Sequence, residues 1–293
     1  MENQPKISVI ITTYNNDQYI RDCVKSVQQQ TYQNLEILIM IDGSTDQTLA
    51  ICEKLRQQDS RIRICVKHHV GISALRNAAL QLITGDFLTF VDGDDTIGKT
   101  MINDLFQQMR QDQSDMVCGN AYRIDNDGTY YFFVDSHSPK QQKLTGAYLP
   151  EKWVLMENNI FTFPMPWAKI YKKELFQQIE YPVNQLAEDN LTTWKLALTA
   201  KTVSYVNIQE YCWRLRKDSI TEHHKNDFKV LKNNLRAIQE RIQLYPLLNI
   251  DSKFLYDKYL GYLKIAKEKG AQASKTNLLK NASYKLQLLK KYR

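Results

Sequence analysis

The most informative part of this sequence is the stretch Gly85-Asp86-Phe87-Leu88-Thr89-Phe90-Val91-Asp92-Gly93-Asp94-Asp95. Its first part, from Phe87 to Val91, is a short apolar run of the kind that forms a buried strand. The run ends directly in three acids within four residues, Asp92, Asp94 and Asp95. Carboxylates this close repel one another in a partly desolvated crevice, so such a cluster usually persists because a cation lies among them. The stretch therefore predicts a buried strand with a metal site at its carboxyl end.

Units of strand and helix surround this stretch on both sides. The expected strands before it cover residues 7–12, 35–41 and 62–66, and a helix follows each, at about 19–31, 44–55 and 71–82, the second capped by Ser44 and Thr45. After it, the pattern predicts a helix at about 99–109 and a strand at 116–118. Strands that alternate with helices of ten or more residues predict an α/β fold, with a mostly parallel sheet and helices on both faces. Ligands of such sheets bind beyond the carboxyl ends of the strands.

The pattern changes after about residue 120. We expect a hairpin turn at 125–128, a loop over 135–143, an irregular segment at 163–167, a helix that opens at Glu188, short strands at 203–206 and 210–214, and helices from 228 onward. The sequence thus predicts a catalytic domain over residues 1–224, followed by a basic helical region over residues 225–293.

Composition places the chain among folded globular proteins. Of its 293 residues, 43% are hydrophobic, which is enough for a sizeable core. The first residues lack the pattern of a secretory signal, and no run reaches the roughly 18 apolar residues of a spanning helix. The five cysteines are odd in number and widely spaced, so we expect free thiols in a reducing compartment. These features predict a cytoplasmic protein.

The positive charge lies in the last part of the chain. The net charge is +7, but residues 252–293 hold eleven Lys or Arg and two acids, a net charge of +9, so the rest carries −2. Apolar positions at helical spacing alternate with these lysines. Such a helix either packs one face on its own domain or lies peripherally on the anionic inner face of a membrane. Nucleic-acid binding is disfavoured, because no recognised binding module accompanies the charge.

Several side chains at the expected strand ends could carry chemistry. The turn after the first strand has neither a glycine-rich dinucleotide fingerprint nor a phosphate loop, so a phosphorylated ligand would need a metal to neutralise it. Asp92 and Asp94 offer the hard oxygens that Mg²⁺ and Mn²⁺ prefer, although an acidic turn can also simply cap the next helix. Asp42 could accept hydrogen bonds from a nucleotide or cap the helix after it. Tyr14 could stack on a base or belong to the rim, and Arg76 could pair with a phosphate or with the acids, or lie on a solvated helix face.

A second acidic pair, Glu188-Asp189, lies where a segment enters a helix. One carboxylate in such a place can cap the helix amides while the other points outward as a general base. Acidic helix starts are common, so the pair by itself leaves both interpretations open.

The order and spacing of these pieces match one family. The chain carries, in order, Ser8-Val9-Ile10-Ile11-Thr12-Thr13-Tyr14-Asn15, Ile41-Asp42-Gly43-Ser44-Thr45-Asp46, Gly71-Ile72-Ser73-Ala74-Leu75-Arg76-Asn77, Phe90-Val91-Asp92-Gly93-Asp94-Asp95 and Glu188-Asp189. Together they closely resemble the family 2 glycosyltransferases of GT-A fold, a Rossmann-like architecture, over roughly residues 6–222. The resemblance implies a UDP-sugar donor bound across the strand ends and a saccharide, lipid-linked or wall-polymer acceptor.

The resemblance also implies roles for single residues. On the nucleotide-sugar side it places Thr12, Tyr14, Asp42, His69, Arg76, Asp92, Gly93 and Asp94. Within this set, Asp94 of the DXD-type motif is the ligand of Mn²⁺ or Mg²⁺. Asp189 is the catalytic base, and Glu188, Trp167 and Lys169 lie on the acceptor side. Arg214, with the segment 219–221, resembles a loop that closes near the donor phosphates.

These roles imply an inverting transfer in a single displacement, in bacterial surface polysaccharide or wall-polymer synthesis. The Gln-x-x-Arg-Trp signature of the processive synthases is absent, which favours transfer of one sugar. His68-His69 departs from the small or polar residue that is common there. Two rival functions stay open: a metal-dependent phosphohydrolase or nuclease that uses Asp92, Asp94, Asp95, Glu188 and Asp189 as a two-metal site, and a catalytically silent scaffold.

Overall fold

The computed structural model describes residues 4–132, 141–145, 162–217, 219, 222, 227–272 and 283–287. The first half of the chain forms the predicted alternation. Its elements are β1 (Ile7–Thr13), α1 (Ile20–Gln28), β2 (Leu35–Asp42), α2 (Thr48–Gln58), β3 (Ile62–Lys67), α3 (Ile72–Leu82), β4 (Phe87–Asp92), β5 (Thr96–Ile97) and α4 (Met101–Asp112).

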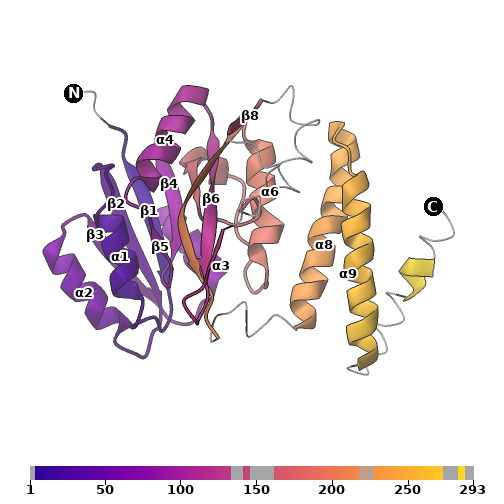
Figure 1. Cartoon of the computed structure of the whole chain (residues 1–293), viewed down its shortest axis with the longest axis horizontal. Helices are drawn as coiled ribbons and strands as arrows, with labels where there is room; N and C mark the ends of the chain where they lie inside the picture. The colour runs from indigo at the N-terminus through magenta and orange to yellow at the C-terminus, as the bar shows by residue number, and fades with distance from the viewer. Residues whose placement is uncertain are drawn as a thin grey trace.

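The second half completes the sheet and then becomes helical. Its elements are β6 (Met116–Ile124), β7 (Tyr130–Phe132), β8 (Gln141–Thr145), β9 (Lys169–Lys172), η1 (Lys173–Phe176), α6 (Glu188–Thr199), β10 (Thr202–Arg214), α8 (Phe228–Leu244), η2 (Tyr245–Leu248) and α9 (Lys253–Gln272). In Figure 1, α8 and α9 stand side by side at the end of the molecule away from α2.

The strands form one ten-stranded sheet in the order β3-β2-β1-β4-β9-β6-β10-β5, with β7 paired to β6 and β8 paired to β10. Strands β1 to β4 run parallel, and so do β6 and β10, whereas β9 lies antiparallel between β4 and β6. The mostly parallel α/β sheet with flanking helices confirms the predicted fold class.

Helices cover both faces of this sheet because alternate strand residues point to opposite sides. Along β2, Ile37, Ile39 and Ile41 belong to a core shared with α1, α2 and α4, while Leu38 and Met40 belong to a second core shared with α3 and α6. The second core continues into the C-terminal helices through buried side chains of α8 and α9, namely Leu231, Ile238, Leu255, Tyr259, Leu263 and Ala266. One face of α9 thus packs on the rest of the protein, which is the first of the two interpretations given for the basic region.

Some expected boundaries are wrong. The two short strands expected at 203–206 and 210–214 are one strand, β10, whose pairing with β6 is interrupted by register shifts between Tyr205 and Tyr211. Strand β8 occupies residues 141–145, where part of a loop was expected, and residues 135–140 of that loop lie outside the described residues.

The cap of α2 also differs from the expectation. Ser44 and Thr45 do not cap this helix, because the Ser44 hydroxyl accepts a hydrogen bond from the Asn15 amide and the Thr45 amide donates to the Asn15 side chain. The Asp46 carboxylate takes their place and accepts from the Thr48 amide.

Other sequence expectations are met within the described residues. All five cysteines are free thiols. None of the helices in the described ranges is long and apolar enough to cross a bilayer.

Candidate functional site

The acidic turn that follows β4 lies directly on the end of β1. The Gly93 amide donates to the Thr12 carbonyl (2.9 Å), and the Asp95 amide donates back to the Asp92 carbonyl (3.0 Å). A Cβ on Gly93 would lie 2.6 Å from the Cβ of Thr13, so only glycine allows this close approach. The turn is therefore fixed between two parallel strand ends, where ligands of such sheets bind.

The three acids of the turn have different surroundings. Asp92 Oδ1 lies 3.2 Å from Nη2 of Arg76, and Asp94 Oδ2 accepts from Nε of Arg216 at 2.7 Å. The Asp95 carboxylate is buried and turned inward, where it accepts from the Tyr211 hydroxyl (2.7 Å) and the Arg214 amide (2.8 Å). Of the three acids, Asp92 and Asp94 are therefore the two that remain available to a ligand at the strand ends.

Burial and mutual repulsion govern the ionisation of this turn. Burial raises the pKa of Asp94 above its usual value; the Arg216 guanidinium opposes this, and the charge of Asp92 adds to it. The pKa of Asp95 is raised further, by burial first and then by the charges of Asp94 and Asp92. A cation between Asp92 and Asp94 would relieve this repulsion.

The carboxylates of the turn could supply some, but not all, of the ligands of a divalent metal. Asp92 and Asp94 supply hard carboxylate oxygens, and Mg²⁺ or Mn²⁺ commonly needs only one or two protein carboxylates when substrate phosphates complete its shell. In the part of the chain that the structure describes, no group of three or more His, Cys, Asp and Glu side chains is placed to hold a metal by itself. The expected cluster of three acids is thus reduced to two, because Asp95 belongs to the interior.

Arg76 connects the acidic turn to the second acidic pair. Its buried side chain donates from Nη1 to Glu188 Oε1 (2.6 Å) and from Nη2 to Asp92 Oδ1 (3.2 Å), and its guanidinium lies over the ring of Tyr181 at 5.2 Å. Burial alone would lower the pKa of Arg76, but the charges of Glu188 and Asp92 raise it above its usual value. The solvated helix face considered for Arg76 is therefore wrong, and the pairing with the acids is confirmed.

Asp189 lies beside this ion pair in the first turn of α6. Its Oδ1 accepts from the amide of Asn190, the next residue (2.8 Å). Burial, and then the charge of Glu188, raise the pKa of Asp189 to about 7, although the Asn190 amide and Arg76 act in the opposite direction. Ala187, just before the pair, has a left-handed backbone (φ 55°), a strained conformation for alanine that sets how the helix begins.

The segment that contains Trp167 and Lys169 is buried and meets the site through Tyr211. Trp167 stacks flat on Tyr211, with ring centroids 4.3 Å apart and an interplanar angle of 7°. Lys169 is fully buried and donates to the carbonyls of Thr162, Met165 and Trp167, and burial lowers its pKa to about 8. Lys169 therefore stabilises the conformation of the segment 162–167 by these hydrogen bonds.

The residues expected around a nucleotide base lie together at the ends of β1, β2 and β3. The ring of Tyr14 is 46% exposed and meets the ring of His69 edge-on at 5.2 Å. Both oxygens of Asp42 accept from backbone amides, those of Val70 (2.7 Å) and Gly71 (2.9 Å). Asp42 thus shapes the loop that carries His69 and leads into α3, and does not cap α2.

Two arginines lie where one was expected. The guanidinium groups of Arg214 and Arg216 both lie over the ring of Tyr19, at 5.2 and 5.0 Å, and Arg214 Nε also donates to the Asp94 carbonyl (3.1 Å). Of the segment expected to accompany them, residues 220 and 221 lie outside the described residues.

Sequence reasoning missed Tyr211, Arg216 and the inward role of Asp95. Tyr211 is buried and its hydroxyl also accepts from the Asp92 amide (3.2 Å), so it joins β10 to both ends of the turn. The available signal was weak: Arg216 follows Arg214 by two residues in an extended segment, and side chains two apart in such a segment point the same way.

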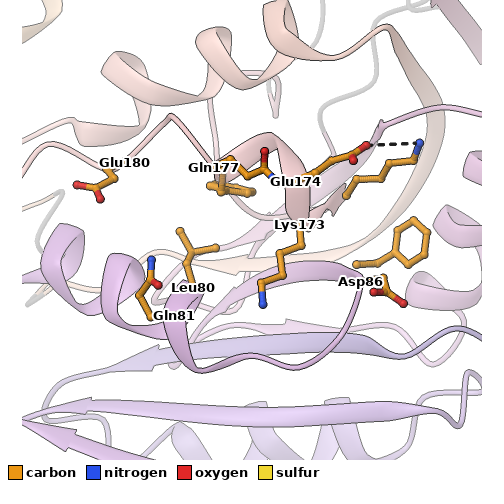
Figure 2. Close-up of a pocket in the computed structure, with 10 residues that line it drawn as sticks. Leu80, Gln81, Asp86, Lys173, Glu174, Gln177 and Glu180 are labelled. Carbon is orange, nitrogen blue, oxygen red and sulfur yellow. Dashed lines mark ion pairs between the residues drawn. The ribbon is translucent and has the colours of Figure 1, made fainter.

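A separate cavity of about 700 Å³ lies at the opposite end of β4. Figure 2 shows Asp86, Lys173 and Glu174 around it, with the ion pair between Lys172 and Glu174 dashed (3.9 Å). Its lysines are already engaged, Lys172 with Asp115 (2.6 Å) and Lys173 with the Ile83 carbonyl (2.8 Å). The acidic turn lies at the other end of β4, away from this cavity.

Comparisons with known proteins agree with this geometry. The family model described as glycosyl transferase family 2 matches residues 8–180. Glycosyltransferase GlyA of Streptococcus pneumoniae is 33% identical over 83% of this chain, but the chain spans only 36% of the length of GlyA. Glycosyltransferase GlyG of the same organism is 29% identical over 96% of this chain and 95% of its own length.

A solved structure gives the same architecture. Residues 1–349 of Staphylococcus aureus TarS, in complex with UDP-GlcNAc, superpose with a TM-score of 0.71 at 24% identity, over 94% of this chain and 79% of that one. TarS is a poly(ribitol-phosphate) β-N-acetylglucosaminyltransferase. At this identity the likeness shows the fold, which is that of the GT-A transferases.

Proposed function

The chain belongs to the family 2 glycosyltransferases, and we propose that it moves a single sugar from a UDP-sugar to a hydroxyl of a saccharide, lipid-linked or wall-polymer acceptor, with inversion, in bacterial surface polysaccharide synthesis. One observation carries this proposal: Arg76 bonds both Asp92 of the acidic turn and Glu188, the neighbour of Asp189. A donor-side acid and the acceptor-side pair are thus held by one guanidinium. The UDP-GlcNAc complex of TarS supports the choice of donor.

On the donor side, we assign the nucleotide to the ends of the first three strands. The exposed ring of Tyr14, beside His69, would stack on the uracil, and the buried Thr12 would line the pocket. Asp42 would act mainly by holding the His69 loop, because both its oxygens already accept backbone amides. Arg214 and Arg216 would face the diphosphate, since their two positive charges gather beside Asp94.

The metal belongs to the same turn in this proposal. Asp94, with Asp92 beside it, would hold Mn²⁺ or Mg²⁺, and the ion would neutralise charge on the departing diphosphate. Gly93 lets the turn approach Thr13 closely enough to keep both carboxylates at the crevice. Arg216 already supplies a positive partner to Asp94, so it would exchange this carboxylate for a phosphate oxygen when the ion binds.

Asp189 serves as the general base. A carboxylate with a pKa near 7 can take the proton from the attacking acceptor hydroxyl at neutral pH, and its basicity exceeds that of an ordinary aspartate. Glu188 keeps this pKa high by its charge while its own charge is balanced by Arg76. One base on one side of the sugar is sufficient for a single displacement with inversion.

The division of the chain at residues 224 and 225 is part of the same proposal, with the basic helical region serving as a support. Within α9, Lys253, Lys258, Lys264 and Lys267 are exposed while the opposite face is buried. An exposed lysine row of this kind could contact anionic lipid, at about 1 kcal/mol per lysine near the surface. We therefore keep peripheral contact of this region with a membrane as a prediction, in addition to the packing of α9 on the domain.

Calorimetric titration of the protein with a panel of UDP-sugars, with and without Mn²⁺, tests the function. We expect one UDP-sugar to bind at micromolar concentration with Mn²⁺ and at least about tenfold more weakly without it. Asp94→Asn should remove the metal-dependent part of this affinity, and Asp189→Asn should leave it nearly unchanged. Failure of every UDP-sugar to bind would refute the donor assignment, and equal loss of affinity in the two variants would refute the separate roles.

A further inference from the structure

Three consecutive aromatic side chains on β7 are exposed to solvent. Tyr130 is 56% exposed, Tyr131 44% and Phe132 61%, although the strand is hydrogen-bonded to β6. Single exposed aromatic rings are ordinary on protein surfaces, but three in a row on one short strand are not needed for its pairing. The strand thus presents more apolar surface than the fold requires.

The rings of this strand fall on two faces. Phe132 and Tyr130 share a face with Tyr122 of β6, and their ring centroids lie 5.5 and 5.9 Å from that of Tyr122, at interplanar angles of 30° and 32°. We name these three rings the aromatic ledge. Tyr131 points to the opposite face, where its ring lies 4.4 Å from the Arg123 guanidinium.

The position of the aromatic ledge relative to the candidate site follows from the strand pairing. β10 pairs along β6 from Met116 to Ile124, so β9 and β7 must both lie on the other edge of β6, one after the other. Between them, the Gly119 amide donates to the Ala168 carbonyl (2.7 Å), which brings the Trp167 segment to the inner end of the ledge. The ledge therefore lies on the same edge of β6 as the segment that contains Trp167.

The ledge also shares its face with the donor side. Cys212 pairs with Tyr122 and Arg214 pairs with Ile124, so Arg214 lies on the face that carries Tyr122, Phe132 and Tyr130. Two strand spacings, about 10 Å, separate the backbone of β10 from that of β7. Arg214 in turn donates to the carbonyl of Asp94 in the acidic turn.

From this placement, and resting on the proposed function, we infer that the aromatic ledge binds the saccharide acceptor, with the apolar faces of its pyranose rings stacked on Tyr130 and Phe132. Each pyranose presents C–H groups on its flat faces and hydroxyls at its edges. Large aromatic rings bury those faces, while polar groups around them receive the hydroxyls. Tyr130 adds a hydroxyl of its own to these polar groups.

Charge favours a saccharide over a membrane. The turn beside the ledge carries two acids, Asp125 and Asp127, and the described cation next to them, Arg123, is paired with Asp125. Their carboxylates would be repelled by an anionic bilayer surface. A neutral saccharide meets no such repulsion, and carboxylates accept hydrogen bonds from its hydroxyls.

Saturation-transfer NMR with chitotetraose and maltotetraose, two neutral tetrasaccharides, tests the ledge directly. We expect at least one of them to receive saturation from the wild-type protein, and Tyr130→Ala/Phe132→Ala to weaken its binding at least about tenfold, given the area and stacking lost. Phe132→Ala alone should weaken tetrasaccharide binding severalfold. This substitution should leave the fold intact, because Phe132 buries little surface. Tyr131→Ala, which truncates a neighbouring exposed ring on the other face, is the matched control and should leave binding unchanged.

The outcomes separate this inference from the proposed function. Binding of the UDP-sugar, measured by calorimetry, should be equal in the wild type, in the two ledge variants and in Tyr131→Ala. Two results would refute the assignment of the ledge as an acceptor site while leaving the proposed function intact. In the first, the donor binds normally but neither tetrasaccharide binds. In the second, a tetrasaccharide binds equally well to the wild type, to Phe132→Ala and to the double variant. Ring-dependent binding to phosphatidylglycerol vesicles, or a dimer that the double variant dissolves in sedimentation, would overturn this assignment in favour of a membrane or a second copy. Failure of any UDP-sugar to bind would instead overturn the proposed function.

Discussion

Two carboxylates of this site, Asp95 and Asp189, differ in where their hydrogen bonds come from. Asp95 accepts from the Tyr211 hydroxyl and the Arg214 amide, both on β10, so it ties the acidic turn to a distant strand. In the described structure, Asp189 accepts from the amide of the next residue, Asn190, which ties it to nothing beyond its own helix. Burial raises the pKa of both. Burial alone therefore does not reveal the role of a carboxylate; its partners do.

The same difference is visible in the residues around each carboxylate. Asp95 lies among groups that hold position, with Tyr211 stacked on Trp167 and bonded to the Asp92 amide. Asp189 lies beside Glu188, whose charge makes loss of its proton harder. These surroundings give Asp95 a supporting role and agree with the proposed role of Asp189 as the base. Substitutions at the two carboxylates and their partners should therefore have different effects.

The largest effect is expected from Asp189→Asn. The amide keeps the shape of the side chain but cannot take a proton, so kcat should fall about a thousandfold, within the range for loss of a general base. The melting temperature should not fall, because the substitution removes a buried negative charge beside Glu188. Transfer rates with the identified donor, together with thermal unfolding, measure both. A variant that keeps more than a tenth of the wild-type kcat would remove Asp189 from the base role.

The pH dependence of the rate is expected to follow the same carboxylate. Burial raises the pKa of Asp189 to about 7, and only the deprotonated form is a base, so kcat should fall about tenfold for each pH unit below 7 and level off above it. From pH 8 to pH 5 this amounts to about a hundredfold. Glu188→Gln removes the neighbouring charge and should move the profile to lower pH. A profile that is flat between pH 5 and 8 would contradict the assignment.

Asp95→Ala is expected to have the opposite effect to Asp189→Asn, with a large loss of stability and a smaller loss of kcat. It leaves the Tyr211 hydroxyl and the Arg214 amide without their acceptor and opens a small cavity, so the free energy of unfolding should fall by about 3 kcal/mol. Donor affinity should weaken about tenfold because the turn that carries Asp94 is loosened, whereas kcat at saturating donor should fall far less than in Asp189→Asn. Urea unfolding and donor titration test the two parts. Wild-type stability in this variant would remove the supporting role.

The sequence predicted the fold well because its evidence is local. Apolar runs of strand length, helical periodicity and the polar ends of strands all lie within windows of a few residues. The errors arose where distant residues compete. Ser44 and Thr45 look like a cap for α2, but Asn15 engages both, and Asp46 caps in their place. β10 looks like two strands because residues 207–209 interrupt its apolar pattern, yet pairing with β6 carries it through as one.

The candidate site divides in the same way. The acidic turn, the loop of His69 and the start of α6 could be placed from sequence, because each follows a strand or opens a helix. The separation of Asp95 from Asp92 and Asp94 could not, since it depends on a hydroxyl 116 residues further along the chain. The pairing of Asp94 with Arg216 spans 122 residues. No local spacing encodes these contacts, and only the assembled sheet brings β10 beside β5 and the turn.

The smallest effect is expected from Tyr211→Phe, which tests the supporting role of Asp95 through one hydrogen bond. The ring and its stack on Trp167 remain, and only the hydroxyl that joins the Asp92 amide to Asp95 is lost, so stability should fall by about 1 to 2 kcal/mol. Tyr205→Phe is a matched control, because Tyr205 is also buried on β10 and its hydroxyl bonds Asn120, away from the acidic turn. Both variants should lose similar stability in urea, yet only Tyr211→Phe should weaken donor binding in the calorimeter. Equal donor affinity in the two would mean that the hydroxyl supports the fold alone, and that the turn keeps its geometry without this hydroxyl.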